Sequence, residues 1–263
     1  MLRPRFRLKT RDEVDAMRPA CRLVAEVLSN VKKLITPGVT TRELDAYIDG
    51  TFAEHGAIPL FKGYTGQKTP FPSATCISVN EEVVHGIPGP RKLVEGDLVT
   101  LDTGCRYLDW CGDSAITVGV GKISPDRQKL WDVAEETLRL AIREIPKCRK
   151  WSQVARKMAD YVRSHGFSVV EQFVGHGIGR NMHEDPQVPN YDARSWNKQD
   201  FWLDEGLVIA VEPMVNMGKK DVKVLGDHWT VVTQDRKPSV HVEHVLAITS
   251  KGVEILTDRS EFE

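Results

Sequence analysis

LVTLDTGCRYLDWCGDSAITV, residues 98–118, contains two runs of β-branched and apolar residues, and an aspartate interrupts each run. Such runs are typical of strands, and CRYLDW between them is typical of a turn, so the stretch predicts an antiparallel hairpin. The hairpin would bring Asp102 and Asp113 side by side. Either aspartate alone could simply end a strand or start a turn. Two buried carboxylates held close together require a cation or a shared proton, so the pair indicates a site.

Two further acids interrupt apolar strands nearer the C-terminus. Glu212 follows LVIAV, Glu243 lies inside VHVEHVLAIT, and His176 comes after the apolar FSVVEQFV. A single strand glutamate is more often at a solvent-facing edge than a ligand. Two Asp, two Glu and one His together form an oxygen-rich donor set that suits two divalent ions bridged by carboxylates. A closed structural zinc site would be richer in Cys and His.

GHGIGRNMHE, residues 175–184, places His176 and His183 seven positions apart among three glycines. The glycine spacing is not G-x-G-x-x-G and no helix start follows, which disfavours a dinucleotide-binding loop. Gln187 stands where H-E-x-x-H needs its second histidine, which excludes the common zinc-protease helix. A nucleophilic Cys76 has no partner signal, and no G-x-S-x-G is present. The simplest alternative is a pair of buried histidines with satisfied hydrogen bonds, and four acids that need a counter-charge weaken it.

Four helices are predicted from apolar residues at helical spacing and from start signals. They are expected at residues 12–34, 40–55, 124–142 and 152–166. Pro19 should kink the first helix or mark its real start. Thr40 with Glu43 forms a capping box for the second, Ser124 caps the third, and Ser152 caps the fourth.

Strands follow each pair of helices, so the chain is predicted to consist of two similar halves. The expected strands are TCISVN, DLVTLDTG and SAITVGV, and then FSVVEQF, GLVIAVEP, HWTVVTQ and VHVEHVLAIT. The halves would cover about 10–122 and 123–257. No proline- or glycine-rich linker separates them, which favours a single domain over residues 1–263.

Composition limits the class of partner. The chain has 263 residues, 41% of them hydrophobic, and a net charge of −1, so no global field would attract nucleic acid or an acidic membrane surface. No apolar run is long enough to span a bilayer, and the basic N-terminus lacks the apolar core of a secretory signal. Five cysteines form no C-x-x-C pair, which predicts a reduced, cytoplasmic protein.

Several motifs together resemble the type I methionine aminopeptidases. They are VNEEVVHGIP, LDTG with CGDSA, GHGIGRNMHEDPQV, VEPMV, VEHV and the longer DHWTVVTQDRKPSVHVEH, in the family's order and spacing over about residues 10–257. The resemblance implies an α+β pita-bread fold, in which two pseudo-symmetric halves surround a central antiparallel sheet and a dinuclear metal site. It also implies removal of the initiator methionine from polypeptides whose second residue is small.

The resemblance also implies roles for the site residues. The metal ligands would be five in number: Asp102, Asp113, His176, Glu212 and Glu243. Asp113 and Glu243 would bridge the two ions. Asp102 would complete one metal site, and His176 and Glu212 would complete the other. Glu212 would act as general base and then acid, His183 would stabilise the oxyanion, and His85 would contact the scissile amide.

By the same resemblance, five residues would line the pocket for the methionine side chain: Tyr64, Phe71, Cys76, Met182 and Trp229. Taken singly, each is more simply an ordinary core residue. The loops at 63–76 and 192–206 are longer than is usual in the family. Met182 replaces a bulky aromatic residue often found before the second histidine. These departures concern specificity more than metal binding.

The implied partners are two divalent metal ions per chain and the N-termini of nascent polypeptides at the ribosome. Cobalt, iron(II), manganese and zinc all suit the donor set. Sequence-specific nucleic acid and membranes are not expected partners, and the chain is expected to be a monomer. Two rival functions are a proline-specific (Xaa-Pro) peptidase, which usually brings an additional N-terminal domain, and a non-catalytic binding protein, which typically loses ligands. All five ligands are present here.

Overall fold

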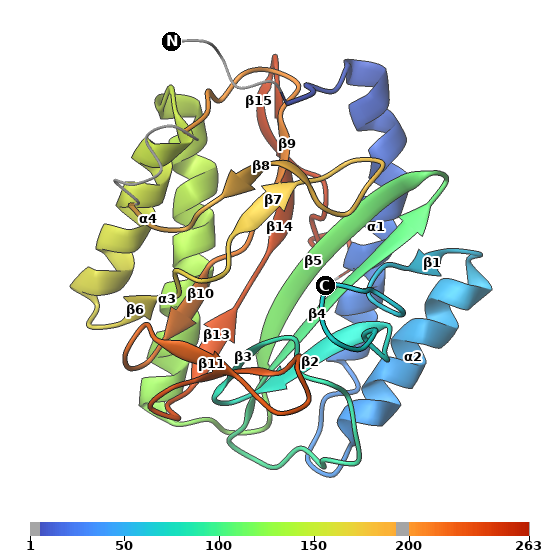
Figure 1. The fold of residues 1–263 in the computed structure, drawn as a ribbon, viewed down its shortest axis with the longest axis vertical. Coiled ribbons are helices and arrows are strands. Elements are labelled where there is room, and N and C mark those ends of the chain that lie inside the picture. Colours follow the sequence, from blue (N-terminus) through green and yellow to red (C-terminus); the bar gives the residue numbers. More distant parts are fainter. Residues whose placement is uncertain (1–5, 193–199, 263) are drawn as a thin grey trace.

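Two pairs of helices flank a central layer of strands on opposite sides of the molecule (Figure 1). The structure, a computed structural model, describes residues 6–192 and 200–262. The helices are α1 (Arg11–Lys32), α2 (Thr41–Glu54), α3 (Pro125–Glu144) and α4 (Trp151–Ser164), with a short 3₁₀ turn at Ile145–Lys147. The expected order of helices and strands is therefore confirmed in the described residues.

The helix α1 begins one residue earlier than predicted because Thr10 provides its cap. The Thr10 hydroxyl accepts the Glu13 amide, and the Glu13 carboxylate accepts the Thr10 amide, which satisfies two amides at the helix start. The helix runs on through Pro19, so Pro19 does not mark its start. Its predicted apolar stripe is buried: Val14, Met17, Cys21, Val24, Leu28 and Val31.

The caps of α2 and α3 are as predicted, but that of α4 is not. Thr40 and Glu43 form the capping box of α2, and Ser124 accepts the Arg127 amide at the start of α3. Ser152, predicted to cap α4, lies inside its first turn, where its amide and hydroxyl both donate to Asp200. The prediction failed because the capping carboxylate comes from a distant segment.

The strands pair antiparallel throughout the described residues and form four hydrogen-bonded sheets. One sheet contains β1 (Ile58–Pro59), β2 (Thr75–Val79), β4 (Leu98–Tyr107) and β5 (Trp110–Gly119). The largest contains β7 (Gly175–Gly177), β8 (Glu184–Val188), β9 (Val208–Val211), β14 (His244–Thr249) and β15 (Gly252–Ile255). A third, small sheet contains β6 (Ser168–Val169), β10 (Met214–Asn216) and β13 (Ser239–His241). A fourth contains β3 (Glu82–Val84), β11 (Val222–Val224) and β12 (Val231–Thr233).

The run VHVEHVLAIT was predicted as one strand, but the chain divides it between two sheets. Its first part belongs to β13, which pairs with β10, and its second part is β14, which pairs with β9. The break falls at Val242 and Glu243. FSVVEQF likewise forms only the two-residue strand β6.

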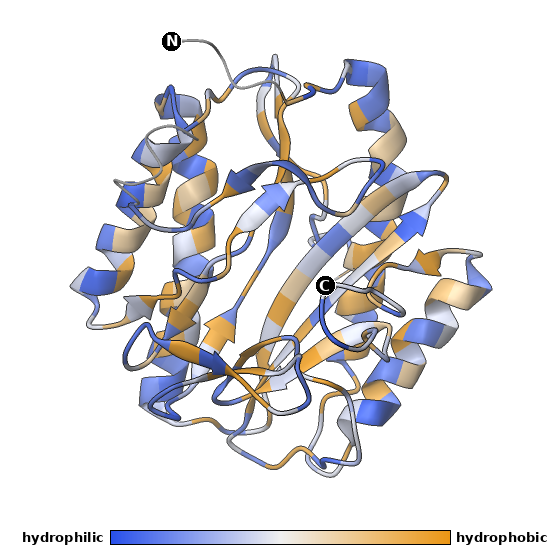
Figure 2. Cartoon of the chain, viewed as in Figure 1, coloured by the Kyte–Doolittle hydropathy of each residue, from blue (hydrophilic) through white to orange (hydrophobic). Residues whose placement is uncertain are grey.

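Each pair of helices covers its own hydrophobic core. On one side Leu28, Ile48 and Leu101 belong to the core between α1, α2 and the β4 sheet. On the other side Leu130 and Met158 belong to the core between α3, α4 and the second half of the strands. Figure 2 shows hydrophobic and hydrophilic residues mixed along each helix and along most strands. The single domain and the boundary between residues 122 and 123 stay predictions.

Among the helices of residues 6–192 and 200–262, none combines the length and apolarity that a bilayer span requires.

Candidate functional site

The hairpin of β4 and β5 places two carboxylates on one face of its sheet. Its turn consists of Leu108 and Asp109, whose φ angles of 50° and 67° are those that a two-residue hairpin turn requires. The strands therefore extend further into CRYLDW than predicted. In this register Asp102 and Asp113 are diagonal neighbours on the same face.

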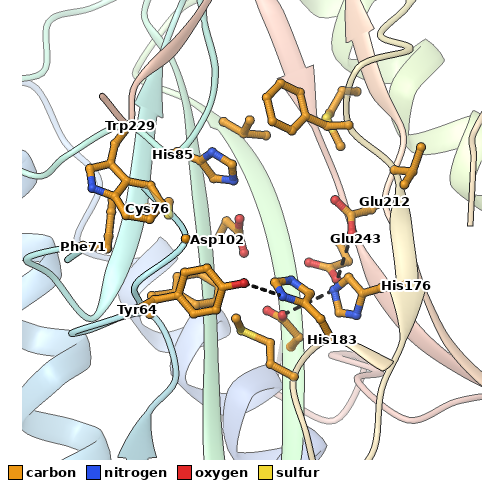
Figure 3. A pocket seen from close by; sticks show the side chains of 18 of the residues that line it. Tyr64, Phe71, Cys76, His85, Asp102, His176, His183, Glu212, Trp229 and Glu243 are labelled. Carbon is orange, nitrogen blue, oxygen red and sulfur yellow. Dashed lines mark hydrogen bonds and ion pairs between the residues drawn. The ribbon is translucent and has the colours of Figure 1, made fainter. Parts of the chain in front are cut away.

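The other three predicted ligands come from the second half of the chain. His176 lies in β7, Glu212 directly follows β9, and Glu243 occupies the break between β13 and β14. Because β9 pairs with both β7 and β14, these positions are neighbours in space. Figure 3 shows them on one side of the pocket, with Asp102 facing them from the hairpin.

Hydrogen bonds from β5 hold the break at Glu243 in place. The Glu243 amide donates to the Ala115 carbonyl at 3.0 Å, and the Ser114 hydroxyl donates to the Glu243 carbonyl at 2.6 Å. Two residues earlier, the Thr117 hydroxyl donates to the His241 carbonyl at 2.8 Å. The backbone that carries this glutamate is therefore fixed against the strand that carries the second aspartate.

Burial leaves the carboxylates of this cluster poorly stabilised as anions. Asp113 and Glu243 are 3% and 2% exposed, and Asp113 Oδ1 and Glu243 Oε1 have no hydrogen-bond partner among the described residues. Burial raises the pKa of Asp113 to about 7. Burial, together with the neighbouring acids, raises the pKa of Asp102, Glu212 and Glu243 well above the ordinary range. Such a cluster is stable in its ionised form only beside a cation.

The donor atoms lie close enough to share a metal ion. One ligand atom from each of Asp113, His176 and Glu243 falls within 4.8 Å of the others. His176 Nδ1 donates to the Gly177 carbonyl at 2.9 Å, so the lone pair is on Nε2. That atom faces Glu212 Oε1 at 3.6 Å and Asp113 Oδ2 at 3.9 Å. Burial lowers the pKa of His176 to about 3, which keeps the ring neutral, and the set therefore fits a divalent metal ion.

The two predicted substrate histidines lie at the edges of this cluster. His183 Nδ1 lies 3.1 Å from the Tyr64 hydroxyl, and its ring meets that of His176 at 4.4 Å between centroids. His85 lies across the pocket, with its ring against those of Phe173 (5.4 Å) and Trp229 (6.2 Å). Burial lowers the pKa of His85 to about 4 and also lowers that of His183. Both rings are therefore neutral near pH 7.

All twelve predicted site residues line one cavity of about 290 Å³. Its apolar end is made by Tyr64, Phe71, Cys76 and Trp229, next to the acids (Figure 3). The Phe71 and Trp229 rings meet edge to face at 5.3 Å. The Trp229 indole donates to the Thr69 carbonyl at 2.9 Å, which ties the long loop at 63–76 to the pocket wall. Part of the other long loop, residues 193–199, lies outside the described residues.

Sequence reasoning missed several residues of this region. Phe61, Phe173 and Met214 also line the cavity. His241 lies just behind Glu212, with Nε2 3.6 Å from Glu212 Oε2, and both its ring nitrogens are buried without a hydrogen-bond partner in the described residues. Burial lowers the pKa of His241 to about 3. His241 could have been predicted from its position two residues before Glu243, because alternate residues of a strand share a face.

Known proteins match this chain over nearly its whole length. The family model of metallopeptidase family M24 matches residues 15–250. Methionine aminopeptidase 1 of Bacillus subtilis is 45% identical over 249 residues, which are 95% of this chain and 98% of the relative. The crystal structure of methionine aminopeptidase from Thermotoga maritima superimposes with a TM-score of 0.89 at 39% identity, over 97% of this chain and 100% of that one.

A more distant likeness concerns the fold alone. The prolidase of Pyrococcus horikoshii has a TM-score of 0.72 at 20% identity, and this chain covers 63% of its length. Both likenesses bear out the expected α+β pita-bread fold. The family match, the identity to curated relatives and the buried acid cluster agree: the chain belongs to metallopeptidase family M24 and, within it, to the methionine aminopeptidases.

Proposed function

We propose that this protein removes the N-terminal methionine from polypeptides whose second residue is small, by metal-assisted hydrolysis of the peptide bond. The observation that carries the proposal is the convergence of buried, unpaired carboxylates and a neutral histidine at the wall of an aromatic cavity. Membership of a metallopeptidase family implies a divalent metal ion. The number of ions, two per chain, is part of the proposal.

Five residues would hold the ions. Asp102 would bind one ion and His176 and Glu212 the other, while Asp113 and Glu243 would be shared. The chemistry that bound divalent ions supply is Lewis acidity, which lowers the pKa of water towards neutral and polarises the scissile carbonyl. Cobalt, iron(II), manganese and zinc all suit four carboxylates and one imidazole.

The chain's own side chains would handle the protons. The carboxylate of Glu212 would take a proton from the attacking water and pass it to the leaving amine. His183 would donate Nε2–H to the oxyanion, because its Nδ1 can accept the hydrogen bond of the Tyr64 hydroxyl. His85, neutral and on the opposite wall, would contact the scissile amide.

The apolar end of the cavity would select the first side chain. Edge-to-face rings of Phe71 and Trp229, with Cys76 and Met182 nearby, suit an unbranched thioether. Sulfur–aromatic contacts of this kind contribute about 0.3–1.5 kcal/mol each. The second residue would pass between His85 and His183, which favours Gly, Ala, Ser, Thr, Cys, Val and Pro over large side chains. A charged first residue would find no partner there.

The proposed substrates in the cell are nascent polypeptides emerging at the ribosome in the cytoplasm, and the chain would act as a monomer. Five free cysteines agree with a reducing compartment.

The decisive experiment is a peptide panel on chelator-stripped protein reloaded with one defined metal at a time. We expect rapid cleavage of Met-Ala-Ser and slow or no cleavage of Met-Lys, Met-Phe and Lys-Ala peptides. Preferred cleavage of Xaa-Pro peptides would instead support the proline-specific alternative. Metal binding without any cleavage would support a binding protein. Efficient hydrolysis of Met-Lys or Lys-Ala would contradict the proposed specificity.

A further inference from the structure

A partly buried ion pair joins the segment before α1 to the residue that follows His183. Lys9 Nζ lies 2.8 Å from Glu184 Oε2, and the two side chains are 5% and 23% exposed. Lysine is rarely buried this far unless it is paired, so the contact is specific. Neither residue lines the cavity described above. The pair therefore lies behind the site and does not touch the pocket.

The surroundings leave the pair little room to move. The Lys9 amide donates to the Gly206 carbonyl at 2.7 Å, and a Cβ at Gly206 would lie 2.4 Å from the Lys9 carbonyl oxygen. On the other side, a Cβ at Gly179 would lie 2.8 Å from both Lys9 Cε and Glu184 Oε1. The backbone thus approaches the lysine closely at two glycines. The glycine at 179 in GHGIGR is explained by this packing.

The same glutamate organises the loop that presents His183. Glu184 Oε1 accepts the Asn181 amide at 3.1 Å, and the Asn181 carbonyl accepts the Gly179 amide at 3.1 Å. The Gly179 carbonyl in turn accepts the Cys111 amide of β5 at 2.8 Å. The loop at 179–184 is therefore fixed to the hairpin at one end and to Lys9 at the other.

We propose that Lys9 and Glu184 are positioning residues for His183, and that they act by fixing the backbone of residues 179–184. The inference rests on the proposed function of His183 at the oxyanion. With the pair intact, the His183 ring is held between the Tyr64 hydroxyl and the ring of His176. Without the ammonium group, the Glu184 carboxylate keeps the Asn181 amide but loses the ion pair that ties it to the segment before α1, and the loop gains freedom. A displacement of about 1 Å at a catalytic group can cost on the order of 10²-fold in rate.

The test is a double-mutant cycle with His183. We expect Lys9→Met to lower kcat on Met-Ala-Ser by roughly 10- to 100-fold with unchanged metal content and little change in KM. In the His183→Ala background the same substitution should cause no further loss, because its effect passes through His183. Arg18→Met is the matched control, since the Arg18–Glu254 pair is an exposed ion pair away from the pocket. It should leave kcat unchanged.

Glu184→Gln provides a second variant if Lys9→Met does not fold. The amide oxygen can still accept the Asn181 amide, while an NH2 group replaces the oxygen that accepts from Lys9, so the ion pair is lost. Equal losses in the wild-type and His183→Ala backgrounds, or wild-type kcat in both single variants, would overturn the proposal.

A readout independent of turnover separates this inference from the proposed function. In metal-stripped protein, the imidazole NMR signals of His183 should shift or broaden in Lys9→Met and stay unchanged in Arg18→Met. If the wild-type protein releases no methionine, the proposed function fails and this measurement alone decides the positioning role. Unchanged His183 signals in Lys9→Met would refute it.

Discussion

Among single residues of the pocket, burial acts on acids and histidines in opposite senses, and in both cases it favours the neutral form. The pKa of Asp113 rises to about 7, while that of His176 falls to about 3. A divalent ion reverses this preference for the carboxylates, because it stabilises their charge. It leaves the histidine neutral, as ligation requires. The pocket is therefore suited to a cation and poorly suited to an empty state near neutral pH.

Single substitutions should distinguish the residues that bind metal from those that act only in catalysis. Asp113→Asn, His176→Ala and Glu243→Gln should each lower bound metal and abolish most activity, because each removes a ligand from the cluster. His85→Ala and His183→Ala should keep their metal and lose turnover on the order of 10²-fold or more. Elemental analysis beside peptide kinetics measures both. Full metal content and turnover in the first three variants would refute the dinuclear site.

The hydroxyl of Tyr64 should matter to catalysis more than to metal binding. Tyr64→Phe removes the hydrogen bond to His183 Nδ1 and keeps the ring against Trp229. A neutral hydrogen bond is worth about 0.5–1.5 kcal/mol net, so kcat should fall by roughly 2- to 12-fold. Phe71→Leu is a useful contrast, because it alters the apolar end and should act mainly on KM for methionine peptides. A Tyr64→Phe effect confined to KM would argue against a role through His183.

Among whole elements, the hairpin of β4 and β5 is central to the site, because it carries Asp102 and Asp113 and holds the backbone at Glu243. The helix α1 packs directly against this hairpin. At Gly112 an added Cβ would lie 2.7 Å from the backbone of Ala20 and Cys21 in that helix. The hairpin itself could be predicted from its β-branched runs. The break in VHVEHVLAIT could not, because it results from hydrogen bonds to β5 across the molecule.

Replacing Gly112 by alanine should push the hairpin away from α1. Overpacking of this kind costs about 1–3 kcal/mol of unfolding free energy, which a denaturant titration measures. Gly50→Ala in α2 is the matched control, because nothing lies within 4 Å of the position that an added Cβ would occupy there. At that position alanine should stabilise by about 0.5–1 kcal/mol. Equal effects of the two substitutions would contradict the close packing at Gly112.

For the molecule as a whole, the acid cluster was predictable because charged residues stood out against apolar strands. The histidine beside Glu212, His241, was harder to predict. His241 carries no local signal beyond its spacing from Glu243, and its contact with Glu212 depends on how three strands meet. The Lys9–Glu184 pair is similarly invisible in the sequence, because the two residues are far apart along the chain.

The stability of metal-stripped protein should fall as pH rises above about 6.5. Histidines with lowered pKa are neutral in the folded state in this range, but in the unfolded chain they lose their protons around pH 6.5. They therefore oppose this fall up to about pH 7.5 and do not contribute above it. Asp113, with its pKa raised to about 7, and the other three acids hold protons in the folded state that the unfolded chain has already released. Unfolding free energy therefore decreases with rising pH until these acids ionise.

Adding manganese at pH 7.5 should restore stability, by about 2.7 kcal/mol at a metal concentration 100 times the dissociation constant. Thermal unfolding from pH 6.5 to 8.5, with and without metal, measures both effects. Stability of the stripped protein that rises from about pH 7.5 to 8.5, where the histidines no longer contribute, would contradict the buried acid cluster.

The contact between Glu243 and β5 has a consequence for how the protein matures. Asp102 and Glu243 are separated by more than half of the chain, so the cluster is a contact of high sequence separation. During synthesis the hairpin emerges long before β14, and domains fold as their residues leave the ribosome. A nascent chain that has emerged only as far as β5 carries two of the five proposed donors, and Glu243 is the last of the five to follow. With the proposed ligands, the metal centre would be among the last features to assemble, and metal uptake would report that the chain has emerged beyond Glu243.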